Sequence, residues 1–435
     1  MKTNTPKPNQ QVCPERGQAS RGIFPVLRFK EFTDEWQEKK LGDFNIKVID
    51  GDRGKNYPNG NDFSDNGYCL FLNAKNVTSS GFSFSERSFI NEQKDSELRK
   101  GKLKENDLVL TTRGTIGNIA FFDQNILYKN MRINSGMVIL RSDGAEISPS
   151  YLYLFSKSTK LSDQIKKISF GSAQPQLTVK DILRLKLTVP LLTEQSKIAL
   201  FLISVDEKIN HLEEKKRGFE KYKKGVMQAI FSQKIRFKKT DGSNYPDWEE
   251  KKLGEIGEFF RGHSYTAINV KEDDYLVLRS NNIQNNKLLT NQELQFVDKP
   301  FGDQIKLRKN DIAICMANGS KKLVGKSAVY DGSYNGHATV GAFCSIYRST
   351  NLISKYLFRM PKYEQEIELL LSGTNINNLK NSDLAGIVFN LPKSIDEQEK
   401  IAVFLTALDS KVDLINKELE QAKLFKKALL QQMFI

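Results

Sequence analysis

The sequence is poor in the residues that build metal centres and disulfides. Its four cysteines, Cys13, Cys69, Cys315 and Cys344, lie far apart with no C-x-x-C pair, and its three histidines are scattered. This spacing suggests neither a zinc site nor a disulfide framework, and it favours a reducing, cytoplasmic location. No apolar run approaches the ~18 residues of a membrane helix. Residues 1–23 lack the apolar core of a signal peptide, so we expect a disordered tail.

Signatures of catalysis are also missing from the sequence. We find no glycine-rich dinucleotide fingerprint and no Asn/Asp-Pro-Pro-aromatic motif of an adenine methyltransferase. The segment 319–327, GSKKLVGKS, resembles a phosphate-binding loop, but it has one residue too many and precedes a strand-like run instead of a helix. The nuclease-like carboxylates of 246–251, PDWEEK, lie within one turn and cannot converge on a metal. We therefore predict a non-catalytic chain with no metal and no cofactor of its own.

The charge balance points to a polyanionic partner. The chain has 66 Lys and Arg residues against 52 Asp and Glu residues, which gives a net charge of +14. Such a balance favours nucleic acid as partner, although a protein with solvated basic helices would share it. At 435 residues, of which 39% are hydrophobic, the chain is long enough for two or three domains with real cores.

One long stretch occurs twice. Residues 194–231 and 397–434 align without a gap, and each repeats apolar residues at heptad a and d spacing over about five heptads. We predict that the seam consists of Ile198, Leu202, Val205, Ile209, Leu212, Phe219, Ile401, Leu405, Leu408, Val412, Ile415 and Leu419. Two such seams can cover each other in an intramolecular coiled coil; two ordinary core helices are the alternative.

Two lysines interrupt the first seam. Lys216 and Lys223 occupy positions where apolar residues are expected. A long lysine side chain can reach solvent from such a position. It can also pair with an acid of the other helix, for which Glu418 or Glu420 is the candidate.

The duplication extends over the whole chain. The segment WQEKKLG at 36–42 recurs as WEEKKLG at 248–254, and Arg-Phe-Lys precedes each copy. Short apolar runs bounded by Gly, Asn and Asp, such as YCLFL and DLVLTT, predict strands inside each unit. We expect mixed α/β units with a mostly β centre. The predicted order is a tail at 1–23, units at 24–189 and 235–388, and long helices at 190–234 and 389–435.

This ordered and repeated set of motifs resembles the specificity subunit of type I restriction–modification systems. The resemblance rests on the W-x-x-x-x-L-G opening of each unit, the loop 171–175, and the Pro-to-Glu-Gln entry of each helix at 190–195 and 392–398. It covers nearly the whole chain. The second unit departs from it at 373–375, where Gly-Thr-Asn replaces the Gly-Ser-Ala-Gln-Pro loop.

The resemblance implies a division of labour. Each unit would be a target-recognition domain that reads one half of a bipartite, asymmetric sequence of double-stranded DNA. The helices would pack antiparallel, set the spacing and dock two modification subunits, which carry S-adenosylmethionine; restriction subunits can join them. The chain itself would have no catalysis. The alternatives are an autonomous DNA-binding or decoy protein without a methyltransferase partner, and a coiled-coil interaction scaffold.

Polar and basic residues on loops after the predicted strands are the candidates for DNA contact. Arginine reads guanine and Asn or Gln reads adenine, whereas lysine holds phosphates. In the first unit the candidates are Arg53, Lys55, Asn73, Lys75, Asn76, Arg113, Ser172 and Gln174. In the second they are Arg261, His263, Arg279, Ser280, Asn281, Asn318, Lys321, Lys322, Thr374 and Asn375. For each of them, a solvated loop is the alternative.

Overall fold

The computed structural model describes residues 22–169, 176–372 and 377–435. Nearly all of the predicted tail lies outside these residues, as do Ser172, Gln174, Thr374 and Asn375. The chain divides into two compact units, Met1–Glu213 with Glu418–Ile435, and Glu214–Lys417. In the described parts, no helix is both long enough and apolar enough to cross a membrane.

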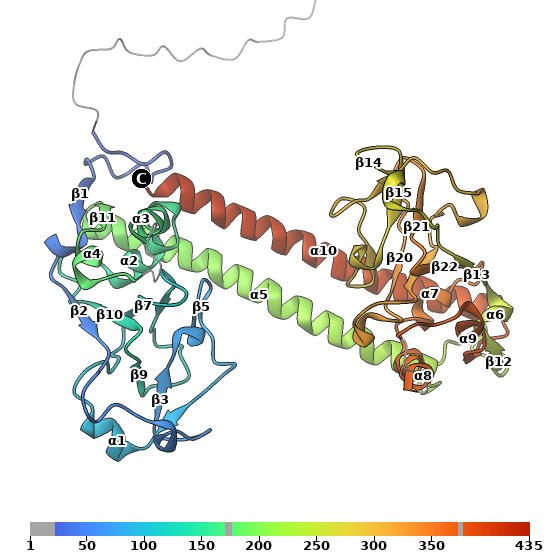
Figure 1. Ribbon diagram of the computed structural model, residues 1–435, viewed down its shortest axis with the longest axis horizontal. Helices are drawn as coiled ribbons and strands as arrows, with labels where there is room; N and C mark the ends of the chain where they lie inside the picture. The colour runs from blue at the N-terminus through green and yellow to red at the C-terminus, as the bar shows by residue number, and fades with distance from the viewer. Residues whose placement is uncertain (1–21, 170–175, 373–376) are drawn as a thin grey trace, which may run out of the picture. The chain divides into compact units, whose positions relative to one another are not determined.

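The first unit is built from small sheets and short helices (Figure 1). Its antiparallel four-stranded sheet has the order β2 (Ile46–Asp50), β10 (Met137–Ser142), β7 (Leu108–Thr111) and β8 (Ile119–Phe121). A three-stranded sheet has the order β6 (Phe89–Ile90), β3 (Cys69–Leu72) and β9 (Met131–Ile133). The pairs are β1 (Gln37–Lys40) with β11 (Lys186–Val189) and β4 (Val77–Thr78) with β5 (Gly81–Phe82). The helices are α1 (Glu92–Glu97), α2 (Pro149–Ser156), α3 (Thr159–Ser169) and α4 (Val179–Leu183).

The alternation of side chains along β7 decides how these layers pack. Leu108 and Leu110 face a core that contains α2, α3 and the long helices, whereas Val109 faces the three-stranded sheet. Because successive strand residues point to opposite faces, a strand such as β7, in which all four residues are buried, is covered on both sides. The four-stranded sheet therefore forms the middle layer of the first unit.

The second unit repeats this plan with longer sheets. Its larger sheet has the order β13 (Glu258–Arg261), β22 (Cys344–Arg348), β19 (Ile312–Cys315), β20 (Ser327–Val329), β17 (Lys287–Leu288) and β16 (Ile283–Gln284). The smaller has the order β14 (Val270–Lys271), β18 (Phe296–Val297), β15 (Tyr275–Leu278) and β21 (Ala338–Val340). β12 (Glu249–Lys252) pairs with β23 (Val388–Leu391). The helices are α6 (Leu253–Ile256), α7 (Ser354–Leu357), α8 (Pro361–Ser372) and α9 (Asn381–Ala385).

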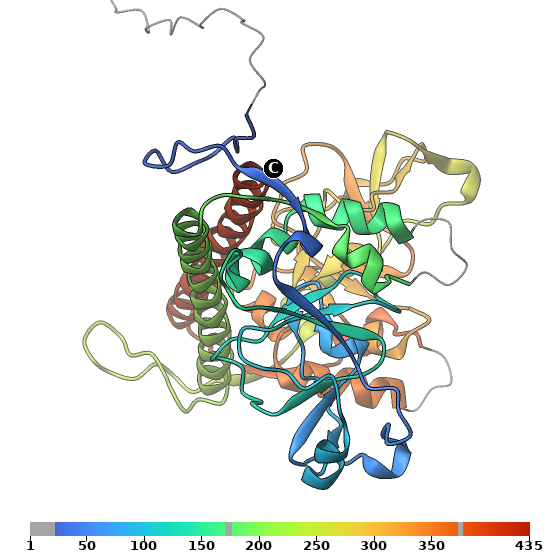
Figure 2. The same ribbon diagram turned by 90° about the vertical axis from the view of Figure 1, so that its left-hand side faces the viewer.

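Two long helices, α5 (Leu192–Phe231) and α10 (Ile395–Met433), contribute to both units. In the first unit Ile209 and Leu212 of α5 pack on Leu419 of α10. In the second unit, Ile230 near the end of α5 shares a core with Ile401 near the start of α10. Within each unit the helices therefore run antiparallel, and Figure 2 shows the green α5 and the red α10 side by side in a second view. The predicted mixed α/β repeat with two long helices is confirmed.

None of the predicted seam residues is exposed, but they pack in two ways. In the first unit Ile198 and Leu202 enter the core of the globular domain together with Leu429 and Phe434. In the second unit Leu405 lies in the domain core in the same way. The outer parts of the seams therefore complete the domain cores, whereas Ile209, Leu212 and Leu419 of the first unit form a separate cluster between the helices.

The Glu-Gln pair at the start of each long helix anchors that helix to its domain. In the first unit Arg28 Nε and Nη2 donate to the two carboxylate oxygens of Glu194, both at 2.7 Å. Gln195 Nε2 donates to the Pro190 carbonyl oxygen at 2.9 Å. In the second unit Arg236 bonds both oxygens of Glu397, at 3.2 and 3.0 Å. The Arg-Phe-Lys motif thus contributes the arginine, and the Pro-to-Glu-Gln motif contributes the glutamate, of one ion pair in each unit.

Charged seam positions pair across the helices. In the second unit the Lys223 ammonium forms an ion pair with Asp409, which also accepts from Arg359 Nη1 at 3.3 Å. In the first unit Lys426 and Asp206, at the same positions of the repeat, form the equivalent pair. The expectation that Glu418 or Glu420 pairs with the seam lysines is wrong for Lys223. Because the two helices pack antiparallel, Asp409 is the acidic residue that lies beside Lys223.

The Glu194 contact generates a prediction about stability. Glu194→Ala leaves Arg28, whose side chain is only 12% exposed, without its carboxylate. We expect the free energy of unfolding of the first unit to fall by about 2 kcal/mol, the scale of hydrogen bonds to charged groups. Urea unfolding in a Trp248→Phe background measures this, because Trp36 then reports on the first unit alone. The exposed Glu207→Ala is the control, and an equal effect of both substitutions would contradict the anchoring role.

A half-buried lysine, Lys157, makes the first unit sensitive to pH. Lys157 Nζ donates to the carbonyl oxygens of Ser79 and Ile119 at 2.9 and 2.8 Å. Burial, with a smaller effect of Lys426, lowers its pKa to about 8. Above pH 8 the folded chain loses this proton while the unfolded chain still holds it, so the stability rises with pH.

We therefore expect the wild type to gain stability relative to Lys157→Gln between pH 8 and pH 9.5. The gain should be about 1 kcal/mol per pH unit, the value of one pKa unit. Urea unfolding at several pH values, with the exposed Lys160→Gln as control, measures it. Parallel pH profiles of wild type and Lys157→Gln would show that Lys157 keeps its proton in the fold.

Candidate nucleic-acid interface

In the first unit, four loops meet at one edge of the sheets. Asn134 N donates to the Leu72 carbonyl oxygen at 3.1 Å, which joins the loop after β9 to the end of β3. Thr112 N, after β7, donates to Gly136 O at 2.9 Å. The loop after β2 joins them so closely that a Cβ at Gly51 would lie 2.2 Å from the Asn134 carbonyl oxygen. Only glycine fits this approach.

The predicted contact residues of the first unit lie on these loops, but their exposure differs. Arg53, Lys55, Lys75 and Arg113 are exposed. Asn73 begins the short 3-10 turn Ala74–Asn76 (η3), where its side chain accepts from Lys75 N at 2.8 Å.

Asn76 is 1% exposed, and its amide donates to the carbonyl oxygens of Ser83 and Glu86. Its hydrogen bonds hold the loop in place. Asn76 therefore positions Asn73 and Lys75, which precede it in the same turn, and its own side chain faces the protein.

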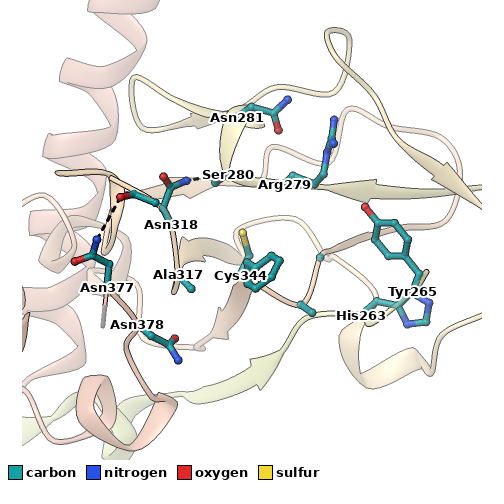
Figure 3. A pocket seen from close by; sticks show the side chains of 14 residues that line it. His263, Tyr265, Arg279, Ser280, Asn281, Ala317, Asn318, Cys344, Asn377 and Asn378 are labelled. Carbon is teal, nitrogen blue, oxygen red and sulfur yellow. Dashed lines mark hydrogen bonds between the residues drawn. The ribbon is translucent and has the colours of Figure 1, made fainter. Parts of the chain in front are cut away.

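The equivalent loops of the second unit surround a hollow of about 1040 Å³ (Figure 3). It lies where β15 and β19 end and before β22 begins. The predicted residues that line it are His263, Arg279, Ser280, Asn281 and Asn318. Asn318 Nδ2 donates to Ser280 Oγ at 3.1 Å, which ties the loop after β19 to the turn after β15. The fold therefore brings together residues that are far apart in the sequence.

Other predicted residues of the second unit lie elsewhere. Arg261 is exposed at the last position of β13 and does not line this hollow. Lys321 and Lys322 line a second hollow of about 790 Å³, beside α8. The sequence reading also missed lining residues, namely Tyr265, Phe343, Asn377 and Asn378. Phe343 belongs to the strand-like run AFCSIY, where an apolar residue is expected in the core. An alignment of this run with GMVIL of the first unit shows that Phe343 corresponds to Gly136.

Polar and apolar side chains both line the hollow of the second unit. Three of the lining residues each have one buried atom without a hydrogen-bond partner within the described residues: His263 Nε2, Arg279 Nε and Asn281 Oδ1. Burial, helped by the charge of Lys299, lowers the pKa of His263 and so favours its neutral imidazole. Phe343, which also lines the hollow, is 71% exposed.

The side chains that line this site suit the recognition of a polar, flat ligand. Over the described ranges, no group of three or more His, Cys, Asp or Glu side chains is placed to hold a metal ion. The hollow combines one guanidinium, several amides and aromatic rings, which together provide hydrogen-bond donors, acceptors and stacking surfaces.

Comparison with known proteins identifies the family. The profile of the type I restriction modification DNA specificity domain matches the chain twice, at residues 33–218 and 245–424. The chain therefore belongs to the family of type I restriction–modification DNA specificity proteins. Its relatives are specificity subunits, in agreement with the prediction of a non-catalytic chain.

Individual relatives differ in how much of the chain they match. The specificity subunit of the type I restriction enzyme StySPI from Salmonella potsdam is 36% identical over 196 residues, which is 42% of either chain. The chain thus matches less than half the length of this relative. The MjaVIII specificity subunit of Methanocaldococcus jannaschii is 25% identical over 416 residues, or 91% of both chains.

Two solved structures share the fold. The S subunit of a type I restriction–modification system from M. genitalium has a TM-score of 0.58 at 18% identity, covering 95% of this chain and 99% of that chain. A chain from a structure on the assembly and conformational transition of the type I system has a TM-score of 0.52, also at 18% identity, covering 91% and 96%. At these identities the likeness concerns the fold alone.

Proposed function

We propose that this chain selects the DNA sequence on which a type I restriction–modification complex acts, and that each of its two domains, 24–189 and 235–388, reads one half of a bipartite, asymmetric target. One observation carries the proposal: equivalent scaffold positions hold different side chains in the two units. The turn that follows β3 in the first unit begins at Asn73, and the equivalent turn after β15 in the second unit begins at Arg279. The middle residue of this turn is Lys75 in the first unit and Asn281 in the second.

The chemistry of these positions supports sequence reading. Asparagine and arginine make paired hydrogen bonds with adenine and guanine, respectively. The exposed Arg53, Lys55 and Lys75 of the first unit suit phosphates, and the net charge of +14 supplies affinity that is independent of sequence. Two domains that share a backbone plan but carry different loop side chains would therefore read two different half-sites.

The long helices are the proposed docking surfaces for two modification subunits, which would hold S-adenosylmethionine; restriction subunits can join this complex. Both helices expose apolar residues at the same positions of the repeat. Leu200 of α5 and Val403 of α10 are 69% and 70% exposed, and Tyr222 and Phe425 are both 54% exposed. Exposed apolar side chains that recur in this way are typical of a protein–protein contact. Two copies of one contact suit two copies of one partner.

The half-site proposal is tested by methylome sequencing of cells that express the chain with its modification subunit. We expect adenine methylation at a split, asymmetric motif that is absent when the modification subunit is expressed alone. Arg113→Ala should relax the motif in one half, and Asn318→Ala should relax it in the other half. The loss of one base contact amounts to about 1–3 kcal/mol.

The exposed Lys309→Ala, which lies before β19 at the end away from the hollow, is the control and should leave the motif unchanged. If both proteins are folded and co-purify but no motif is methylated, the specificity role is excluded. If Arg113→Ala and Asn318→Ala relax the same half, the assignment of one half-site to each domain is wrong.

The docking proposal is tested by the mass of the purified complex. Leu200→Glu should weaken one of the two contacts by about tenfold or more, because burying a leucine contributes about 1.5–3 kcal/mol. The double variant Leu200→Glu/Val403→Glu should weaken both. Mass photometry of the chain with its modification subunit should therefore show loss of one subunit and then of two.

The matched control is Asn210→Glu, an exposed position of α5 that carries no apolar side chain. Complexes of unchanged mass for all variants would place the modification subunits on another surface. A smaller complex for Asn210→Glu as well would indicate that added charge, and not the lost apolar contact, causes the effect.

A further inference from the structure

We propose that the hollow of the second unit holds a single nucleobase of the DNA target, turned out of the base stack and packed on Phe343. This inference rests on the proposed function and deepens it, because it names the ligand of one particular site. It also distinguishes the second domain, where Phe343 lies, from the first, where Gly136 occupies the equivalent position before β10.

The shape of the site is the first argument. In duplex DNA the base edges are recessed within grooves, and the phosphates lie outermost. A convex loop or helix can enter a groove, but a concave surface meets the phosphates before its floor can reach a base. Arg279 and His263 line a hollow of about 1040 Å³, and the Nε atom of Arg279 and the Nε2 atom of His263 are buried. A base that leaves the stack can enter such a hollow, whereas a stacked base cannot.

The polar groups of the floor are the second argument. Buried polar atoms are almost always hydrogen-bonded, and leaving them unpaired is unfavourable. Three residues that line the hollow each have one such atom: a donor in Arg279 Nε, an acceptor in Asn281 Oδ1, and His263 Nε2, which donates or accepts according to the imidazole tautomer. His263 is only 7% exposed. The edge of a nucleobase carries donors and acceptors side by side, and it matches this set.

The aromatic side chains are the third argument. Phe343 is 71% exposed although it is large and apolar, so burial in the fold does not explain it. Stacking of a base on an exposed ring is a common source of affinity for unstacked nucleotides. Tyr265 lines the same hollow and lies near His263, with ring centroids 6.5 Å apart and an angle of 22° between the planes. A flat ligand in the hollow thus finds aromatic rings and polar side chains along its lining.

The test uses the complex of the chain with its modification subunit and the duplex target defined by its methylation. Each base of the half-site read by the second domain is left intact while its partner on the opposite strand is mismatched. A base that leaves the stack does so more easily from a mismatch, so binding becomes tighter at that position. We expect one such position besides the methylated adenine, with an affinity gain of about tenfold.

Variants of the hollow then connect this position to the site. Arg279→Ala and Asn281→Ala should remove the preference for one base at that position and leave the others unchanged. Phe343→Gly, which copies the first unit, should weaken binding to the target about tenfold but leave binding to unrelated DNA unchanged. Leu352→Ala, an exposed apolar residue of the same unit outside the hollow, is the control.

The outcomes separate this inference from the proposed function. If every mismatch weakens binding, or only the methylated adenine responds, the bases stay stacked at this domain and the inference is wrong, although half-site recognition stands. Saturable binding of free nucleoside monophosphates without DNA, abolished by Arg279→Ala, would assign the hollow to a free nucleotide and also overturn it. If no sequence preference is found at all, the proposed function itself fails.

Discussion

Each globular domain completes its hydrophobic core with residues from both long helices, and the rest of the structure depends on this shared burial. In the first unit Ile198 and Leu202 of α5 and Leu429 of α10 lie in one core with the sheet and α2. In the second unit Ile401 and Leu405 of α10 share a core with Ile230 of α5. Neither domain can bury its apolar face without two helix segments that are distant in the sequence.

This dependence explains why the flanks of the repeat are alike while its interior diverges. The Arg-Phe-Lys and Glu-Gln motifs form the same buried ion pair in both units, through Arg28 and Glu194 or Arg236 and Glu397. A change in one partner would leave a buried charge unpaired. The loops at the far edge of the sheets have no such constraint, so they can differ, as Gly136 and Phe343 do. The proposed function uses that freedom: constant contacts hold the scaffold, and variable loops meet the DNA.

Much of the fold could be predicted because its signals are local. The seam repeats apolar residues with the period of a helix, and apolar runs such as CLFL predict buried strands. The candidate site was predicted only in part. Asn318 and Ser280 were both named, but their direct hydrogen bond depends on β15 and β19 ending at the same edge. Phe343 was overlooked, because an apolar residue beside a strand is expected in the core and nothing local marks it as exposed.

The sequence by itself determined the duplication, the two long amphipathic helices, the mixed α/β character of the units and the resemblance to a family, since repeats, periodicity and motifs are properties of the chain order. Only the tertiary structure decided that the helices run antiparallel within each unit, that Asp409 is the partner of Lys223, that Asn76 is buried, and that the second unit has a hollow. Periodicity fixes which face of a helix is apolar, but the partner of that face depends on contacts between residues far apart in the chain.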